Sequence, residues 1–356
     1  MRILVDIGHP AHVHLFKNTA HEMISKGNAF YFTVREGENE SVLLNENGFK
    51  YSVIGKKQKG ALRKILKLFT FSYRILKVAR NFKPDLFLSH GSMYAGYAAL
   101  IYGKKHIALE DTGNMEQLFF SKPVSNVILS PRSLQVDLGR KHIKYDGFHE
   151  LAYLHPARFK PDIAVLNELN LQKDEKYIII RFVSWNATHD IGQTGFSFAQ
   201  KARLIEEISR HVRIFISGEE SLPEEFARFG LKIPPGRFHH ALAFAAMHIG
   251  EGATTVSECA MLGTPALYVN SISAGTLKQQ EKYGLVTCLK QTDGIIEKVI
   301  ELLQFPQLKA EFQHRRRKML LENIDVTSFL VWFIENFPGS KDKLKKDPSF
   351  QGTFKR

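Results

Sequence analysis

The sequence has few cysteines and no long apolar run, and each shortage excludes a class of protein. Only two cysteines, Cys259 and Cys288, occur in 356 residues, both in apolar surroundings and without metal-ligand spacing. A disulfide scaffold is therefore excluded, and reduced thiols are expected. No apolar run reaches the length of a membrane span, and no signal peptide is visible. We therefore expect a cytoplasmic protein.

Acidic residues are outnumbered, with 36 Asp and Glu against 49 Lys and Arg and a formal charge of +13. Such an excess suits nucleic acid, an anionic membrane surface or phosphorylated substrates, or it merely keeps the protein soluble. Because no nucleic-acid-binding motif is present, nucleic acid is not expected as a partner.

Short apolar segments alternate with helical patterns along most of the chain, which predicts an α/β fold with parallel sheets. The alternation is interrupted at 153–162 and then restarts. We expect two Rossmann-like domains facing each other across a cleft, at 1–155 and 156–325, since ligands of such sheets bind beyond the carboxyl ends of the strands. A last helix at 326–340 is expected to pack back on the first domain, and a basic, mobile tail at 341–356 follows. The expected strands are 3–7, 30–34, 86–88, 106–109, 127–129, 177–182, 213–217, 248–249 and 266–269.

The most informative segment is Gly250 to Glu258 (GEGATTVSE), which runs into an apolar helix pattern and then Gly263-Thr264-Pro265. Small residues that open a helix let backbone N–H groups approach a phosphate or a sugar nucleotide. The alternative is local, because Thr255 and Glu258 also fit a capping box.

A second loop, Gly8 to His14, holds three histidines within six positions after the first expected strand. A histidine there can act as a general base near neutral pH, or it can simply bond to the backbone. No acidic cluster of suitable spacing accompanies the loop, so a metal site is not expected.

The segment 62–80 contains six Lys and Arg residues and no acid. A basic amphipathic helix of this kind can lie on an anionic bilayer, which would place the protein peripherally on the inner face of the plasma membrane. The alternative is a surface helix whose apolar stripe faces the core.

Four motifs give the chain a resemblance to GT-B glycosyltransferases, in particular to the N-acetylglucosaminyltransferase that forms lipid II. They are 12–27 with Ala20-His21-Glu22-Met23, 83–99 with Gly91 and Gly96, 252–267, and Gln279-Gln280. Sugar-nucleotide 2-epimerases share the fold. The sequence departs from the pattern by Pro10-Ala11 in the first loop, by the acidic Glu251, and by the absence of Gly-Gly-Ser in 184–190. These departures indicate a divergent family.

The resemblance implies a role for each matching position. His9, His12 or Asp111 would act as the base in catalysis, and Glu258 would hold the ribose of the donor. The remaining implied acceptor-side residues are Gly8, His14, His90, Gly91, Ser92 and Glu110. The remaining implied donor-binding residues are Arg181, Ser184, Ser217, Gly218, Gly252, Ala253, Thr254, Thr255, Gln279 and Gln280. In an alternative interpretation, the reactive cluster is formed by Arg181, His189 and Asp190, or these residues have a structural role.

The expected function is therefore that of a glycosyltransferase of the hexosyltransferase type. It would move a sugar from a nucleotide-diphosphate donor to an envelope glycan or a lipid-linked acceptor. No Asp-x-Asp motif lies near the donor strands, so no metal or other cofactor is expected. The alternatives are a non-hydrolysing sugar-nucleotide 2-epimerase and a non-catalytic GT-B-like binding module.

Overall fold

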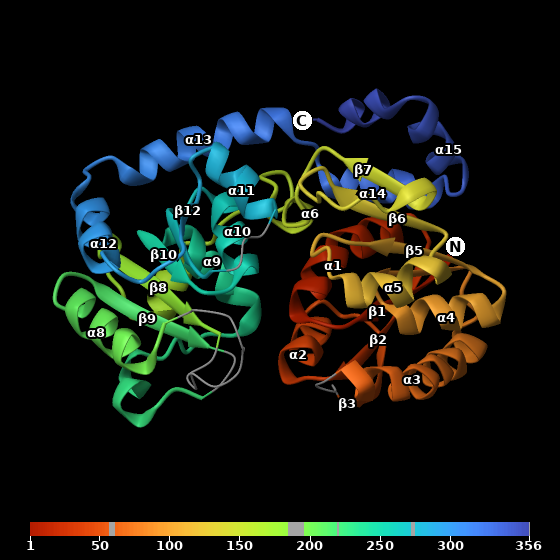
Figure 1. The fold of residues 1–356 in the computed structure, drawn as a ribbon, viewed down its shortest axis with the longest axis horizontal. Coiled ribbons are helices and arrows are strands. Elements are labelled where there is room, and N and C mark those ends of the chain that lie inside the picture. The colour runs from red at the N-terminus through yellow and green to blue at the C-terminus, as the bar shows by residue number, and fades with distance from the viewer. Residues whose placement is uncertain (57–60, 184–195, 219–220, 272–274, 356) are drawn as a thin grey trace. The chain divides into compact units, whose positions relative to one another are not determined.

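The structure is a computed structural model that describes residues 1–56, 61–183, 196–218, 221–271 and 275–355. The chain forms two compact units (Figure 1). Unit 1 consists of Met1–Arg158 and Asn323–Arg356, and unit 2 of Phe159–Glu322. The expected boundaries at 155/156 and 325/326 lie three residues from these. Since the chain enters and leaves unit 2 once each, unit 2 is inserted into unit 1.

Unit 1 is built on a parallel sheet of seven strands in the order β3-β2-β1-β4-β5-β6-β7. The central strands of such a sheet are covered on both faces by helices, so their residues are apolar and nearly all buried, as in β1, where five of six residues are buried. The strands are β1 (Arg2–Ile7), β2 (Ala29–Glu36), β3 (Tyr51–Lys56), β4 (Leu86–His90), β5 (Lys105–Leu109), β6 (Val127–Pro131) and β7 (His142–Tyr145). The helices are α1 (Pro10–Ser25), α2 (Glu38–Glu46), α3 (Ala61–Phe82), α4 (Met93–Tyr102), α5 (Met115–Val124), α6 (Leu151–Leu154), α14 (Val326–Glu335) and α15 (Gly339–Lys346).

Unit 2 repeats this architecture with a parallel sheet of five strands in the order β12-β11-β10-β8-β9. Isoleucines of β8 and β9 form its core together with Leu204 and Ile208 of α8. The strands are β8 (Tyr177–Phe182), β9 (Arg213–Gly218), β10 (Met247–Gly250), β11 (Ala266–Val269) and β12 (Thr287–Leu289). The α-helices are α7 (Val165–Glu168), α8 (Phe198–Ser209), α9 (Phe238–Phe244), α10 (Ala253–Leu262), α11 (Gly275–Lys282), α12 (Ile295–Gln304) and α13 (Leu308–Glu322). The expected pair of α/β domains is thus present.

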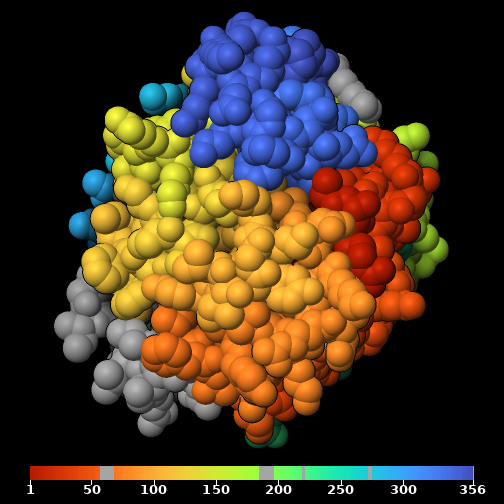
Figure 2. Space-filling view, turned by 90° about the vertical axis from the view of Figure 1, so that its right-hand side faces the viewer, coloured from red at the N-terminus to blue at the C-terminus, as the bar shows by residue number. Residues whose placement is uncertain are grey.

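The C-terminal segment corrects the expectation of a mobile tail at 341–356. After α14, which packs on α1 and α6, the chain forms α15 and a 3₁₀ segment, Pro348–Phe354. Leu344 is buried, and the rings of Phe350 and Trp332 lie 4.9 Å apart. Figure 2 shows this segment, in dark blue, lying on the red and yellow parts of unit 1. Aromatic packing therefore holds a segment whose lysines suggest a solvated tail.

The basic helix α3 is packed on one side and exposed on the other. Leu68, Phe71 and Ile75 face the core, whereas the side chains of Phe69 and Tyr73 are 79% and 60% exposed. The buried stripe agrees with the alternative of a surface helix whose apolar side faces the core. The rings of Phe69 and Tyr73 nevertheless remain on the outer face, beside basic residues of the same helix. No helix among the described residues is long and apolar enough to cross a membrane.

Candidate functional site

Each sheet has one position where the strand order reverses, and the candidate residues gather there. In unit 1 the reversal lies between β1 and β4, and in unit 2 between β8 and β10. Loops that leave two such neighbouring strands diverge to opposite faces of the sheet, which opens a ligand site beyond the carboxyl ends of the strands. The histidine loop follows β1, and the glycine-rich segment 250–258 follows β10.

His9 and His12 are held by the backbone of the loop that starts α1. His9 is the N-cap residue, and its Nδ1 accepts a hydrogen bond from the Ala11 N–H at 3.2 Å. The Nδ1 atom of His12 accepts from the Gly8 N–H at 3.2 Å. In a neutral imidazole whose Nδ1 is an acceptor, the proton resides on Nε2. Both rings therefore present an N–H donor, and neither is arranged as the general base that the sequence suggested.

Burial, reinforced by the neighbouring His90, holds the pKa of His12 well below 6.5. The His12 ring is stacked on the His90 ring with their centroids 4.5 Å apart. A neutral His12 with a proton on Nε2 suits the binding of an oxygen atom or an anion.

Asp111 lies between two imidazoles at the carboxyl ends of the strands. His90, the last residue of β4, places Nε2 at 2.9 Å from Oδ1 of Asp111. His149, which follows β7, places Nδ1 at 3.3 Å from Oδ2. Burial raises the pKa of Asp111, but His149 and His90 outweigh it and hold that pKa well below 3.8. Burial lowers the pKa of His90, but the hydrogen bond and the charge of Asp111 outweigh it and raise that pKa above 6.5. We refer to His90, Asp111 and His149 as the imidazole–carboxylate cluster.

His149 was missed by sequence reasoning, as was its neighbour Tyr145. The rings of these two residues lie 6.1 Å apart and perpendicular. Apart from the 3.3 Å contact of His149 Nδ1 with Asp111, neither the ring nitrogens of His149 nor the hydroxyl of Tyr145 has a hydrogen-bond partner among the described residues. No local motif marks either residue, because β7 alone brings them to Asp111.

The other candidates that the resemblance assigns to the acceptor side either shape the loops next to the cluster or pack between helices. Oε1 of Glu110 accepts hydrogen bonds from the backbone of Thr112 and Gly113 and thereby shapes the loop that holds Asp111. Gly91 adopts a φ of +55°. A Cβ atom there would lie 2.2 Å from the end of the Gln117 side chain, and the positive φ would strain any larger residue. His14 is buried and stacks on Tyr153, which makes it a packing residue between α1 and α6.

A buried ion pair that the sequence did not reveal lies beneath this site. Oδ2 of Asp6 lies 2.8 Å from Nη2 of Arg35, and their side chains are 1% and 10% exposed. Asp6 also accepts hydrogen bonds from Thr33 and Ser92. Since Ser92 is the N-cap residue of α4, this network ties β1, β2 and α4 together under the histidine loop.

In unit 2 the N-terminus of α10 points its free N–H groups beyond β10. The N-cap residue is Gly252, and no side chain among the described residues caps this end. Thr255 is the third residue of the helix and not its cap, so the capping-box alternative is wrong. Gly252 and Ala253 are half-buried and Thr254 is exposed. An uncapped helix start with small residues is suited to an anion.

Arg181 and Ser217 lie at the carboxyl ends of the adjacent strands β8 and β9. Arg181 donates from Nη1 to the Ser217 hydroxyl at 2.7 Å, and the two residues are register partners. Gly218 ends β9. Ser184, His189 and Asp190 lie outside the described residues, and the last two are the partners of Arg181 in the alternative cluster.

Glu258 is buried and paired with a histidine that the sequence did not single out. Its Oε1 lies 3.0 Å from Nε2 of His239 in α9, and both side chains are almost fully buried. His248 of β10 is also fully buried, and burial lowers its pKa to about 4. Glu258 therefore has a partner within the protein at the position where the resemblance implies a ribose.

The two glutamines of α11 have different surroundings. Gln280 is fully buried and donates from Nε2 to the Ser257 hydroxyl at 2.6 Å, which fixes α11 to α10. Gln279 is half-buried and accessible. Of the pair, Gln280 is thus a packing residue and Gln279 is the accessible one.

The acidic Glu251, which the sequence sets against an anion site, turns into the protein. Its carboxylate accepts hydrogen bonds from the N–H groups of Val183 and Phe196 at 3.0 and 2.8 Å, and Lys201 lies 3.7 Å away. This charge is therefore balanced within unit 2 and does not oppose an anion at α10. It also holds together the residues at either end of 184–195.

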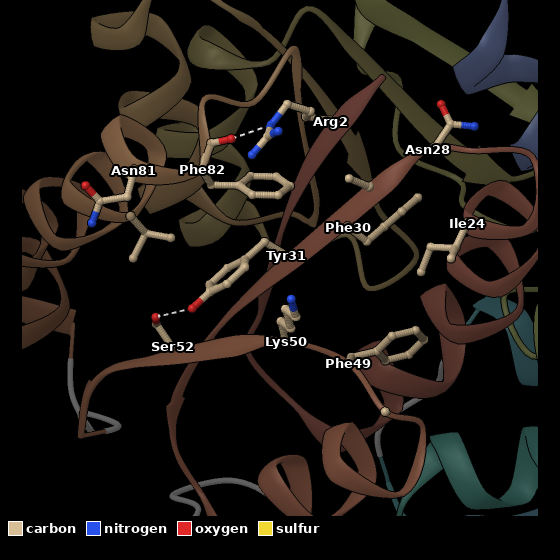
Figure 3. A pocket seen from close by; sticks show the side chains of 13 residues that line it. Arg2, Ile24, Asn28, Phe30, Tyr31, Phe49, Lys50, Ser52, Asn81 and Phe82 are labelled. Atoms are coloured by element: carbon tan, nitrogen blue, oxygen red, sulfur yellow. Dashed lines mark hydrogen bonds between the residues drawn. The ribbon is translucent and has the colours of Figure 1, made fainter.

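A cavity of about 570 Å³ lies elsewhere in unit 1. Figure 3 shows it lined by residues that start β1, β2 and β3, with Tyr31 bonded to Ser52 and Arg2 bonded to the Phe82 carbonyl. These are the amino ends of the strands, opposite the edge that carries the histidines. The cavity is therefore not part of the candidate site.

Comparison with solved structures shows the GT-B fold. The UDP-GlcNAc 2-epimerase from Neisseria meningitidis, bound to UDP-GlcNAc, is 15% identical with a TM-score of 0.64, covering 93% of this chain and 98% of its own. MurG from Acinetobacter baumannii is 15% identical with a TM-score of 0.58, covering 94% and 99%. The glycosyltransferase SsfS6 from Streptomyces sp. SF2575 is 12% identical with a TM-score of 0.59, covering 94% and 99%. The expected GT-B fold is confirmed.

Comparison of sequences is more limited. No curated protein sequence matches the chain. One family model, described as "Protein of unknown function (DUF354)", matches residues 1–332. The chain belongs to this DUF354 family.

Proposed function

We propose that the protein is a glycosyltransferase that moves a sugar from a nucleotide-diphosphate donor to a hydroxyl of a glycan or lipid-linked acceptor. The observation that carries this proposal is that chemically suited residues lie at both strand-order reversals. The uncapped start of α10 and Arg181 lie at one reversal. His12 and the imidazole–carboxylate cluster lie at the other.

Unit 2 binds the donor in this proposal. The leaving diphosphate meets the N–H groups of α10 and the guanidinium of Arg181, which supply positive charge without a metal ion on this side. Glu258, oriented by His239, is the carboxylate for the ribose, and Gln279 reads a sugar hydroxyl. Fixed donors of this kind stabilise the charge that develops as the glycosidic bond breaks.

Unit 1 binds the acceptor. The hydroxyl that attacks the sugar lies against His12 Nε2–H and loses its proton at the imidazole–carboxylate cluster. Support comes from the low pKa of His12, which keeps its ring neutral, and from the ionised Asp111 beside it. A lipid-linked acceptor also gives a role to the exposed aromatic rings of α3, which would contact an anionic bilayer.

The test uses the full chain with a panel of nucleotide sugars. Thermal shift identifies the donor, and release of the nucleoside diphosphate is followed with and without acceptor. We expect Arg181→Ala to lower the rate by about 100-fold, as removal of one transition-state donor does, and Glu258→Gln to weaken donor binding. Glu301→Gln, on the exposed face of α12, is the matched control.

Three results would contradict the proposal. Full activity of both site variants would remove the donor site from α10. Conversion of the donor sugar without any acceptor would indicate a 2-epimerase instead, the activity named for one of the structural neighbours. Absence of binding to every nucleotide sugar would indicate a non-catalytic module.

A further inference from the structure

The imidazole–carboxylate cluster has the composition of a metal site. Its potential ligand atoms are Nε2 of His90, a carboxylate oxygen of Asp111 and Nδ1 of His149, and all lie within 4.8 Å of one another. The sequence did not predict a metal site, because no acidic cluster of suitable spacing accompanies the first histidine loop. The three residues instead come from the ends of β4, β5 and β7.

The distances in the cluster agree with ligands around one ion. Nitrogen and oxygen ligands lie about 2.0–2.2 Å from Zn²⁺ in tetrahedral sites, which places neighbouring ligand atoms roughly 3.4 Å apart. The two distances here, from Asp111 to His90 and to His149, are 2.9 and 3.3 Å. Small movements of the side chains are sufficient to admit an ion.

The burial of His149 points in the same direction. His149 is 5% exposed, its Nε2 atom has no hydrogen-bond partner in the described part of the chain, and its Nδ1 atom has only the 3.3 Å contact with Asp111. A buried polar group without a partner is costly, so its presence calls for a missing ligand. Nδ1 of His149 faces Asp111 at 3.3 Å, where an ion shared with that carboxylate would satisfy it.

His12 is not one of the ligands. Its Nδ1 atom is already an acceptor for the Gly8 N–H, so its Nε2 carries the proton and cannot coordinate a cation. The stacked His12 ring instead presents a donor beside the cluster, where it can bond to an oxygen atom that the ion holds. Asp111 is the most exposed member, with 24% of its side chain accessible, so the site is open on the Asp111 side.

We propose that His90, Asp111 and His149 bind one divalent transition-metal ion, of the Zn²⁺, Co²⁺ or Fe²⁺ type. Two imidazoles with one carboxylate favour these ions over Mg²⁺ and Ca²⁺, which prefer oxygen ligands. Three protein ligands leave positions open for an oxygen atom of a substrate. Binding of the ion does not depend on the proposed transfer. If that transfer holds, the ion would hold the acceptor hydroxyl at the cluster and lower its pKa, and the proton would then pass to solvent rather than to the Asp111 carboxylate.

The experiment measures metal binding by the full chain without any nucleotide or sugar, so its outcome is separate from that of the donor assays. The protein is stripped with a chelator, and Zn²⁺ is titrated calorimetrically. Co²⁺ is added in parallel as a probe, because its visible bands report the number and type of ligands. We expect one ion for each chain and Co²⁺ bands of a four- or five-coordinate site with nitrogen ligands.

Variants identify the ligands. Changes to residues that only hydrogen-bond to metal ligands already weaken metal binding by roughly 10–100-fold. Changes to the ligands themselves, His90→Gln, Asp111→Asn and His149→Gln, should each weaken it by about 100-fold or more. His21→Gln is the control, since this exposed histidine of α1 contacts Asn47 and lies outside the cluster. Circular dichroism establishes that each variant is folded.

Two results would overturn the proposal. One is the absence of Co²⁺ bands and of Zn²⁺ binding in the wild-type protein. The other is unchanged binding in all three cluster variants, which would mean attachment to other histidines. If a variant does not fold, the Co²⁺ spectrum of the wild-type protein still tests the ligands. A spectrum of a six-coordinate ion with oxygen ligands alone would contradict a site with two imidazoles.

Discussion

Replacement of Asp6 by alanine tests whether the buried ion pair under the histidine loop holds unit 1 together. The change removes a carboxylate that is 1% exposed and leaves the Arg35 guanidinium, 10% exposed, without its counter-charge. Breaking a buried pair by removing one partner costs about 3–5 kcal/mol. We therefore expect Asp6→Ala to lower the free energy of unfolding of unit 1 by about that amount.

The double variant Asp6→Ala/Arg35→Met separates the charge from the contacts. With both charges removed, no uncompensated ion stays in the interior, and a hydrophobic replacement of a buried pair is often neutral. The double variant should thus recover most of the lost stability. The hydroxyls of Thr33 and Ser92 lose an acceptor in both variants, so this part of the cost is common to them.

The assay is urea unfolding followed by tryptophan fluorescence. The chain has two tryptophans, and Trp332 belongs to unit 1. A Trp185→Phe background therefore makes the signal report on unit 1 alone. The reasoning is refuted if Asp6→Ala costs less than about 1 kcal/mol, or if the double variant is as unstable as the single one.

Three further predictions concern other parts of the molecule. Burial lowers the pKa of His106 from 6.5 to about 3. Between these two pH values the unfolded chain binds a proton at this residue that the folded protein does not. The free energy of unfolding of unit 1 therefore falls by up to about 1.4 kcal/mol for each pH unit of acidification. His106→Gln should reduce this slope in urea unfolding at pH 7 and 5.5, and an unchanged slope would exclude this histidine as its source. Gly250→Ala should lower the melting temperature and abolish nucleotide-induced thermal shifts, because the Cβ atom of the alanine would lie 2.6 Å from Nε2 of the buried His248. Normal thermal shifts would mean that the end of β10 tolerates a side chain. Phe69→Ser should reduce sedimentation with anionic vesicles while Leu321→Ser, on α13 and 74% exposed, should not, and equal sedimentation of both would argue against docking through α3.

The sequence predicted the central strands well and the edges poorly. Central strands such as β1 and β8 are apolar runs because helices cover both of their faces. The three strands that sequence reasoning missed, β3, β7 and β12, each lie at the edge of a sheet. Only one residue of β3 and none of β12 is fully buried, so their composition carries little apolar signal. Helix α13 was missed for the same reason, since only Phe312 and Met319 of its residues are buried.

The candidate site was predictable residue by residue but not as an arrangement. His90 and Asp111 were both expected near the acceptor, and their pairing follows from the adjacency of β4 and β5. His149 was not predictable, because it reaches Asp111 through β7, an edge strand that was itself missed. Likewise, the expected charge conflict at Glu251 disappears because its partners are backbone N–H groups, which no sequence pattern displays.

The insertion of unit 2 into unit 1 determines the order in which the protein can be completed on the ribosome. Residues 159–322 emerge as one block and can close their own sheet while the chain is still growing. Unit 1 has to wait, because α14 contributes Phe329 and Phe333 to its interior and covers α1 and α6. Until the last helices leave the exit tunnel, the side of α1 that packs against α14 has no cover. The helical layer over α1 and α6 is thus completed only at the end of synthesis.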